Sequence, residues 1–333
     1  MGKSFYRFSL FSIILSFIIG VTVTVFPPEN EYMAVEKDGY IKWVDFNVSY
    51  EVLSDCLKYD IDTYGKENHT NWIDLLAHLA AKGNGSLKNY KKSELQKITS
   101  EIESGKTIEE ISKGLKSYPY YREAYSAVLG GFVGEFEIEK EDGTYEKKYG
   151  LKAFSPIAKG YSYSHFDDFG VSRSYGFKRK HLGHDMMGSV GTPVIAVESG
   201  YVECVGWNQY GGWRIGIRSF DKKRYYYYAH LRRDHPYNDM YEGKVVTAGD
   251  VIGYLGMTGY STKENVNNIN TPHLHWGMQL IFDESQKDAL AEIWIDVYAI
   301  TKLLEQNRSA VVKDSEQKEY YRKYQMFESG LET

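Results

Sequence analysis

The stretch TPHLHWGMQL, Thr271–Leu280, alternates two kinds of residue from its first histidine onward. In a β-strand, side chains two residues apart point to the same face of the sheet. The alternation therefore predicts a strand whose apolar face, beginning with Leu274 and Trp276, packs on a core. His273 and His275 share the opposite face and are expected to project together into a groove, where one can bind a metal and the other can work beside it.

A second histidine motif lies upstream, HLGHD at His181–Asp185. Histidine and aspartate are usual ligands of a catalytic zinc, which takes three protein ligands and leaves a fourth position open for water. Gly183 relieves steric restriction in this short segment, so His181 and Asp185 can clamp one ion from a loop. His184 has no second acid or histidine at a matching spacing, and we expect it to stand beside the ligands.

A third candidate is His230, in the stretch RYYYYAHL. This stretch is rich in aromatic residues that favour strands, and as a strand it places Tyr226, Tyr228 and His230 on one face. A histidine near an activated water can move protons as a general acid or base. His230 is therefore a candidate for acid–base chemistry beside the metal.

Short apolar runs separated by turn residues surround these motifs and predict an antiparallel β fold. The first two runs flank Glu198-Ser199-Gly200, which is expected to form a hairpin turn. The expected strands are Val194–Val197 with Tyr201–Val205, Trp213–Ser219 with Arg224–His230, and Val251–Leu255.

Residues 154–280 resemble the lysostaphin-type (LytM-like) zinc metallopeptidases, which cut peptide bonds in bacterial peptidoglycan. Several motifs carry the resemblance in the same order along the chain. They are FGVSR at Phe169–Arg173, HLGHD at His181–Asp185, GTPVIAVESGYV at Gly191–Val202, YAHL at Tyr228–Leu231, GKVVTAGDVIGYLGMTGYST at Gly243–Thr262 and PHLHWG at Pro272–Gly277.

The resemblance implies a mostly antiparallel β peptidase domain with an open groove, and peptidoglycan peptides as its substrates. It implies that one zinc is bound by His181, Asp185 and His275. It also implies two catalytic histidines, His230 and His273. Tyr175 lies six residues before the first ligand, where a tyrosine helps to stabilise the transition state in some members of the family.

The chain departs from the family pattern in two places. The segment KENVNNINT, Lys263–Thr271, is inserted between the Ser-Thr turn and Pro272, and we expect it to reshape one wall of the groove. Gly277 replaces an acidic residue that commonly follows the second histidine motif. Neither departure touches a predicted ligand, so they bear on substrate preference more than on chemistry.

Residues 1–28 are predicted to form a cytoplasmic N-terminus and a transmembrane anchor. Lys3 and Arg7 precede an uncharged stretch, residues 8–26, close to the ~20 residues that span a bilayer. Positive residues before the span favour a cytoplasmic N-terminus and an extracytoplasmic remainder, in a bacterial cell membrane. A cleaved signal peptide is the alternative, although no A-x-A-like site or lipobox cysteine follows the apolar run.

The rest of the chain divides by composition and periodicity. Apolar residues at helical spacing predict a helical domain at 29–134, whose role is open between a spacer, a wall-binding module and a docking site for an envelope protein. A charged hairpin or linker at 135–152 precedes the peptidase domain at 153–300, and a charged helical tail is expected at 301–333. The expected helices are Val48–Tyr59, Asn71–Ala81, Lys92–Ser104, Thr107–Leu115, Tyr120–Phe132 and, after the groove motifs, Ile293–Gln306.

The sequence as a whole thus predicts an α+β protein that is a membrane-anchored zinc endopeptidase of the bacterial cell wall. The net charge of −5 does not suggest a nucleic-acid partner. Some relatives that have lost ligands serve as envelope scaffolds, so a non-catalytic protein that binds wall peptides or recruits other hydrolases is the alternative. The complete set of five histidine and aspartate positions favours the enzyme.

Overall fold

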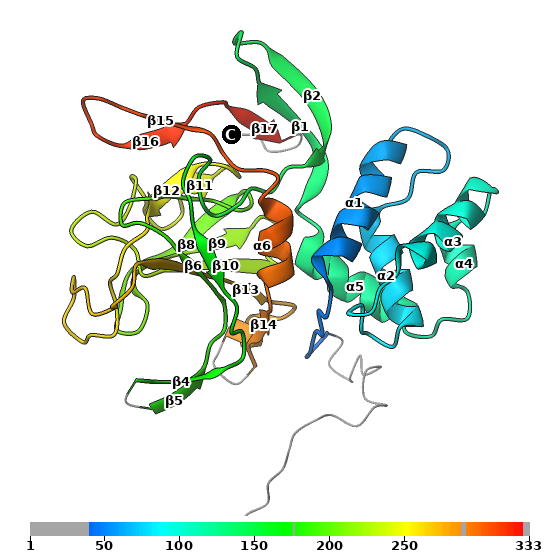
Figure 1. Ribbon diagram of the computed structural model, residues 1–333, viewed down its shortest axis with the longest axis horizontal. Helices are drawn as coiled ribbons and strands as arrows, with labels where there is room; N and C mark the ends of the chain where they lie inside the picture. Colours follow the sequence, from blue (N-terminus) through cyan, green and yellow to red (C-terminus); the bar gives the residue numbers. More distant parts are fainter. Residues whose placement is uncertain (1–39, 176, 288–290, 329–333) are drawn as a thin grey trace, which may run out of the picture. The chain divides into compact units, whose positions relative to one another are not determined.

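The computed structural model describes residues 40–175, 177–287 and 291–328. Figure 1 shows a group of helices followed along the chain by antiparallel strands. The α+β class predicted from the sequence is confirmed. In the described residues no helix is long and apolar enough to cross a bilayer, and the predicted anchor at 1–28 lies outside them.

Five helices form where apolar periodicity predicts them. Helix α2 is apolar nearly all round and contacts each of the other four, as expected of a helix buried at the centre of a helical group. The side chain of Asn71 caps its start by accepting a hydrogen bond from the backbone N–H of Ile73 at 2.9 Å. The helices are α1 (Tyr50–Thr63), α2 (Trp72–Lys82), α3 (Lys92–Glu103), α4 (Ile108–Ser112) and α5 (Tyr118–Leu129).

An eight-stranded antiparallel sheet carries the histidine motifs. The alternating stretch His273–Leu280 is strand β13, and it lies between β10 and β6. Its apolar face is fully buried, with Trp276 donating a hydrogen bond to Thr301 of helix α6 at 3.1 Å. In spatial order the strands are β11 (Val245–Val246), β8 (Gly200–Asn208), β9 (Gly212–Ser219), β10 (Arg224–Ala229), β13, β6 (His184–Met187) and β3 (Ser164–Phe166), and β14 (Ile293–Ile295) pairs with β13.

The predicted hairpin across Glu198-Ser199-Gly200 is wrong. Strand β7 (Pro193–Ile195) pairs with β12 (Val251–Tyr254) in a separate sheet, whereas β8 pairs with β9. All four side chains of the run Val194–Val197 are fully buried, so the run has no polar face to turn toward solvent. Such a strand must be covered by other residues on both faces. Pairing with β12 outside the large sheet places it where both faces are covered. The second predicted hairpin, between β9 and β10, is confirmed.

The tail is also different from the predicted charged helix. The segment predicted as a helix from Ile293 begins with β14, and helix α6 covers only Tyr298–Leu304. Short strands follow α6 instead of a helix, because side chains of this segment contact residues elsewhere in the chain. Met326 is buried, and Arg322 donates a hydrogen bond to Asp250 at 3.2 Å. The strands are β15 (Val311–Lys313), β16 (Tyr320–Arg322) and β17 (Met326–Glu328), and β17 extends the predicted hairpin of β1 (Val133–Glu139) and β2 (Tyr145–Leu151) into a three-stranded sheet.

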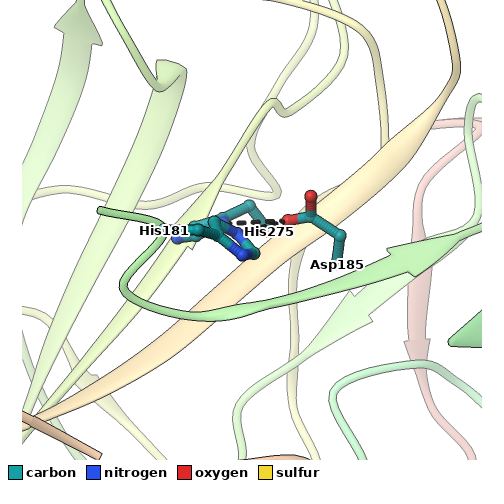
Figure 2. A group of neighbouring side chains, drawn as sticks. All are labelled: His181, Asp185 and His275. Carbon is teal, nitrogen blue, oxygen red and sulfur yellow. Dashed lines mark hydrogen bonds and ion pairs between the residues drawn. The ribbon is translucent and has the colours of Figure 1, made fainter. Parts of the chain in front are cut away.

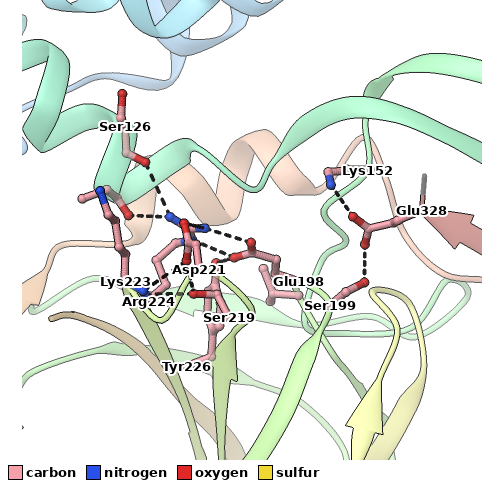
Figure 3. Close-up of polar contacts among 12 residues, drawn as sticks. Ser126, Lys152, Glu198, Ser199, Ser219, Asp221, Lys223, Arg224, Tyr226 and Glu328 are labelled. Atoms are coloured by element: carbon pink, nitrogen blue, oxygen red, sulfur yellow. Dashed lines mark hydrogen bonds and ion pairs between the residues drawn. The ribbon is translucent and has the colours of Figure 1, made fainter. Parts of the chain in front are cut away.

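A buried arginine ties the helices to the large sheet (Figure 3). Arg224, at the start of β10, is 1% exposed and donates to both carboxylate oxygens of Glu198 at 2.8 and 3.0 Å. Its Nη1 also donates to the carbonyl of Ala127 near the end of α5 at 2.8 Å. A Cβ on Gly131 would stand 1.6 Å from Glu198 Oε1, so only glycine fits where the chain passes this ion pair. The helical segment and the sheet therefore share a charged, solvent-excluded contact.

We expect Arg224→Met to destabilise the protein by about 3–5 kcal/mol, because it leaves the Glu198 carboxylate buried without its cation. Arg233→Met is the matched control, since Arg233 pairs with Asp234 on the exposed surface and such pairs contribute only ~0–1 kcal/mol. Urea unfolding measures both. Equal unfolding midpoints for the two variants would show that the buried pair does not hold the two segments together.

Candidate active site

Three neighbouring strands bring the histidine motifs together. In the register of β13 with its neighbours, His275 stands opposite Asp185 of β6 on one side and Ala229 of β10 on the other. His181 lies just before β6, and His230 directly follows β10. Three segments that are far apart in the sequence, around His181, His230 and His275, thus meet at one place on the sheet.

His181, Asp185 and His275 converge on one another (Figure 2). His181 Nε2 lies 2.8 Å from His275 Nδ1 and 3.0 Å from Asp185 Oδ1, and His275 Nδ1 lies 2.9 Å from the same carboxylate oxygen. His181 and Asp185 are buried, and His275 is half-buried. Two imidazole nitrogens and a carboxylate oxygen, all within 4.8 Å of one another, are donor atoms of the kind that can hold a metal ion such as zinc.

Gly183 allows this approach. A Cβ at this position would stand 2.6 Å from both Cε1 and Nε2 of His275, and 2.8 Å from the carbonyl oxygen of Trp276. The backbone of the HLGHD segment therefore passes directly against the ring of His275. Gly183 therefore allows close contact with His275. The sequence predicted only that this glycine relieves steric restriction between His181 and Asp185.

Two residues that the sequence motifs did not mark as functional contact this cluster. An oxygen of the Asp168 carboxylate lies 2.7 Å from His181 Nδ1, although the pair does not have hydrogen-bond geometry. Arg173 donates to Asp168 at 2.8 and 3.0 Å and to Asp185 Oδ2 at 2.7 Å. Asp168 and Arg173 lie on the FGVSR side of the first histidine motif, and no periodicity marks them as neighbours of the ligands.

The charges around Asp185 keep it ionised. Burial alone would raise the pKa of this carboxyl, but hydrogen bonds from His181 and His275, followed by the electrostatic interaction with His275 and His273, hold its pKa well below its usual range. An ionised carboxylate is the form that a metal requires. Burial is also the main reason that the pKa of His275 is lowered, which favours the neutral ring that can ligate.

His230 and His273 stand side by side next to this group, with ring centres 4.7 Å apart. His230 Nδ1 lies 2.8 Å from the carbonyl oxygen of Thr258, and His273 Nδ1 lies 2.8 Å from that of Thr271. A carbonyl oxygen can only accept, so both rings carry their proton on Nδ1 and present Nε2 as a proton acceptor. His273 Nε2 is buried, has no hydrogen-bond partner among the described residues, and lies 3.7 Å from Asp185 Oδ2.

The backbone and surroundings of His230 are unusual. Its φ is +60°, in the left-handed region that residues other than glycine rarely adopt, and such strain gathers at functional sites. Burial, followed by the charges of His273 and His275, lowers its pKa well below the usual value for histidine. His230 is therefore neutral at neutral pH and able to accept a proton.

His184 of the first motif and Tyr175 before it were also considered from the sequence. His184 points away from the ligands and its Nε2 lies 2.8 Å from His165 Nδ1, and burial lowers its pKa to about 4. It is not part of the cluster formed by His181, Asp185 and His275. Tyr175 ends the short strand β4 (Ser172–Tyr175), which pairs with β5 (Phe177–Lys180), and its side chain lies outside the described part of the chain.

A groove of about 550 Å³ opens on the histidine site. Its floor comes from β10 and β13, and its walls include Arg179, Tyr210 and Tyr260. None of the described lining residues belongs to the inserted segment Lys263–Thr271, so the insertion does not itself line the groove. The insertion instead supports the wall, because Asn268 donates to the carbonyl of Tyr260 at 2.7 Å.

A sequence model of the Peptidase family M23 matches residues 179–288, the range that contains the two histidine motifs and His230. The chain carries a domain of peptidase family M23. The M23 domain also has curated relatives. The chain is 34% identical over 174 residues to an L-Ala–D-Glu endopeptidase of Bacillus subtilis, covering 52% of this chain and 50% of the relative. It is 37% identical over 119 residues to lysostaphin of Staphylococcus simulans, covering 35% of this chain and 20% of that protein.

A solved structure extends the similarity in fold beyond the M23 domain. It comes from Ruminococcus gnavus, is described as a candidate LytM glycyl-glycine endopeptidase, and is 24% identical to this chain with a TM-score of 0.51. The match covers 82% of this chain and 92% of that one. By contrast, the chain spans only half the length of the Bacillus relative and a fifth of lysostaphin.

Proposed function

We propose that the protein is a zinc-dependent endopeptidase that hydrolyses peptide bonds in bacterial peptidoglycan. The observation that carries the proposal is the His181, Asp185 and His275 cluster, with two further histidines beside it that each carry a proton-accepting Nε2. Membership of the M23 domain in a peptidase family, and the names of its relatives, support this reaction and this class of substrate.

One zinc ion per chain would be held by His181 Nε2, Asp185 Oδ1 and His275 Nδ1. The fit rests on the convergence of these atoms and on Asp168: with Nε2 bound to the metal, His181 would carry its proton on Nδ1, where the Asp168 carboxylate lies 2.7 Å away. Zinc supplies a Lewis acid that polarises a carbonyl group and lowers the pKa of water to ~7.

His230 and His273 would move the protons of the reaction. A proton taken at Nε2 of either ring is stabilised by the carbonyl oxygen that already holds Nδ1–H, that of Thr258 or Thr271. The same ring can then donate this proton to the leaving amine. Tyr175, six residues before His181, is assigned by the family pattern to help stabilise the transition state.

Digestion of whole peptidoglycan followed by mass spectrometry tests the function. We expect peptide fragments with a new amino terminus and glycan strands of unchanged length, and the fragment masses identify the bond that is cut. Binding to peptidoglycan without any release of fragments would instead support the alternative, a scaffold that binds wall peptides or recruits other hydrolases.

We also propose that residues 1–28 anchor the protein in the bacterial cell membrane with the catalytic domain outside, and that the helical segment is available to an envelope partner. The support is the uncharged stretch 8–26 with Lys3 and Arg7 on its amino side only. In fractionated cells the full-length protein should sediment with membranes and be digested by protease added to spheroplasts. A soluble, secreted form that begins near Glu29 would show a cleaved signal peptide instead.

A further inference from the structure

Arg179 is held between two aromatic rings in the wall of the groove. Its guanidinium carbon lies 5.0 Å from the ring centre of Tyr210 and 4.9 Å from that of Tyr260. The three residues come from different segments: β5, the turn between β8 and β9, and the loop after β12. Stacking on aromatic faces fixes the plane of a guanidinium and leaves its N–H donors at the edge free to bind.

No carboxylate in the described part of the chain neutralises this cation. The other arginines of the groove differ, because Arg173 pairs with Asp168 and Asp185, and Arg218 pairs with Glu203. The described residues that line the groove include five cationic side chains and two carboxylates. Both carboxylates are engaged: Glu203 contacts Arg218 and Lys287, and Glu292 accepts from Trp294 Nε1 at 2.8 Å. The described residues that line the groove thus carry an excess of positive charge. Among them, Arg179 is held in place by its two stacking partners and has no carboxylate partner in the described part of the chain.

The position of Arg179 is close to the reacting centre. One of its two stacking partners, Tyr260, has its ring centre 5.9 Å from that of His230. The backbone of Tyr260 has a φ of +47°, and its carbonyl oxygen accepts a hydrogen bond from Asn268. The ring of Tyr260 therefore contacts both Arg179 and His230, one of the proposed acid–base pair.

We propose that Arg179 is a specificity-determining residue that binds a free carboxylate on the substrate, next to the bond that is cut. Guanidinium and carboxylate groups match in a two-pronged geometry, and a groove with excess positive charge favours an acidic ligand. The enzyme would then select stem peptides in which a glutamate keeps its free carboxylate, over amidated stems and over runs of glycine. This inference rests on the proposed peptidase function.

The test compares two synthetic stem peptides that are identical except for one glutamate, which carries either a free α-carboxylate or a carboxamide. We expect wild-type protein loaded with zinc to cleave the carboxylate peptide with a kcat/KM about 10–100-fold higher, the range of a charge-assisted hydrogen bond. Arg179→Gln should lower kcat/KM for the carboxylate peptide and bring the ratio between the peptides to about one. Arg179→Lys should leave an intermediate ratio, because it keeps the charge but loses the planar fork.

Lys178→Gln is the matched control, since it removes the same charge from the exposed residue just before Arg179, which is not among the described lining residues of the groove, and should preserve the preference. Zinc content and thermal unfolding of each variant separate a specific effect from misfolding. Equal kcat/KM values of the wild type for both peptides, or an unchanged ratio in Arg179→Gln, would overturn this inference alone. A wild type that cleaves neither the peptides nor whole peptidoglycan would overturn the proposed function with it.

Discussion

His275→Ala protein is expected to lose both its zinc and its peptidoglycan cleavage. The substitution removes one of three converging donor atoms, and the two that remain cannot complete a three-ligand site. Loss of a residue that only orients a ligand costs about 10–100-fold in metal affinity, so Asp168→Asn should fall between wild type and His275→Ala. Metal analysis of the purified proteins gives the zinc content per chain.

His184→Gln is the control for this series, because His184 belongs to the same motif but faces His165 instead of the ligands. It should retain one zinc per chain. Full zinc occupancy in His275→Ala, or loss of zinc in His184→Gln, would show that the ligands have been assigned incorrectly.

His230→Ala and His273→Ala are expected to separate catalysis from metal binding. Each should keep nearly one zinc per chain while cleavage of peptidoglycan falls by ~10²–10⁴-fold, the usual effect of losing a general acid or base. The reason is geometric, since both rings present Nε2 beside the ligand cluster and neither belongs to it. Zinc content and initial rates measured on the same preparations test both halves of the expectation.

The left-handed backbone of His230 calls for a second variant at that position. Asparagine adopts a positive φ more readily than alanine, so His230→Asn removes the ring with less backbone strain. It should be as inactive as His230→Ala but as stable as wild type. Loss of zinc from either histidine variant would make that histidine a ligand, and wild-type cleavage rates in both would favour the binding scaffold.

The periodicity of apolar residues predicted the individual strands and helices whose formation depends on the local sequence. The alternation around His273 and His275 defines β13 with its buried face, and helical spacing defines five helices before residue 130. The five histidine and aspartate positions named from the motifs meet in the structure. For His273 and His275, the period of the strand also predicted that the two side chains share a face. The prediction that His230 shares a face with Tyr226 and Tyr228 is wrong. His230 follows the end of β10 with a φ of +60° and lines the groove, whereas Tyr226 and Tyr228 are buried on the other face.

Interactions between distant segments were not predictable in this way. The run Val194–Val197 is apolar at every position, which does not reveal whether its partner is the next strand or β12. The tail is dense in charge and was interpreted as a helix, but its charged side chains pair with other segments, as Arg322 does with Asp250. Arg173 and Arg224 act through carboxylates whose proximity only the fold determines.

The most direct test of the central claim is a zinc titration of peptidoglycan cleavage. Protein stripped of metal with a chelator should release no new amino groups from purified peptidoglycan. Release should return in proportion to added zinc and level off at one equivalent per chain, and His275→Ala should not respond. Undiminished release of amino groups by the metal-free protein, or no release at one equivalent of zinc, would contradict a zinc endopeptidase built on His181, Asp185 and His275.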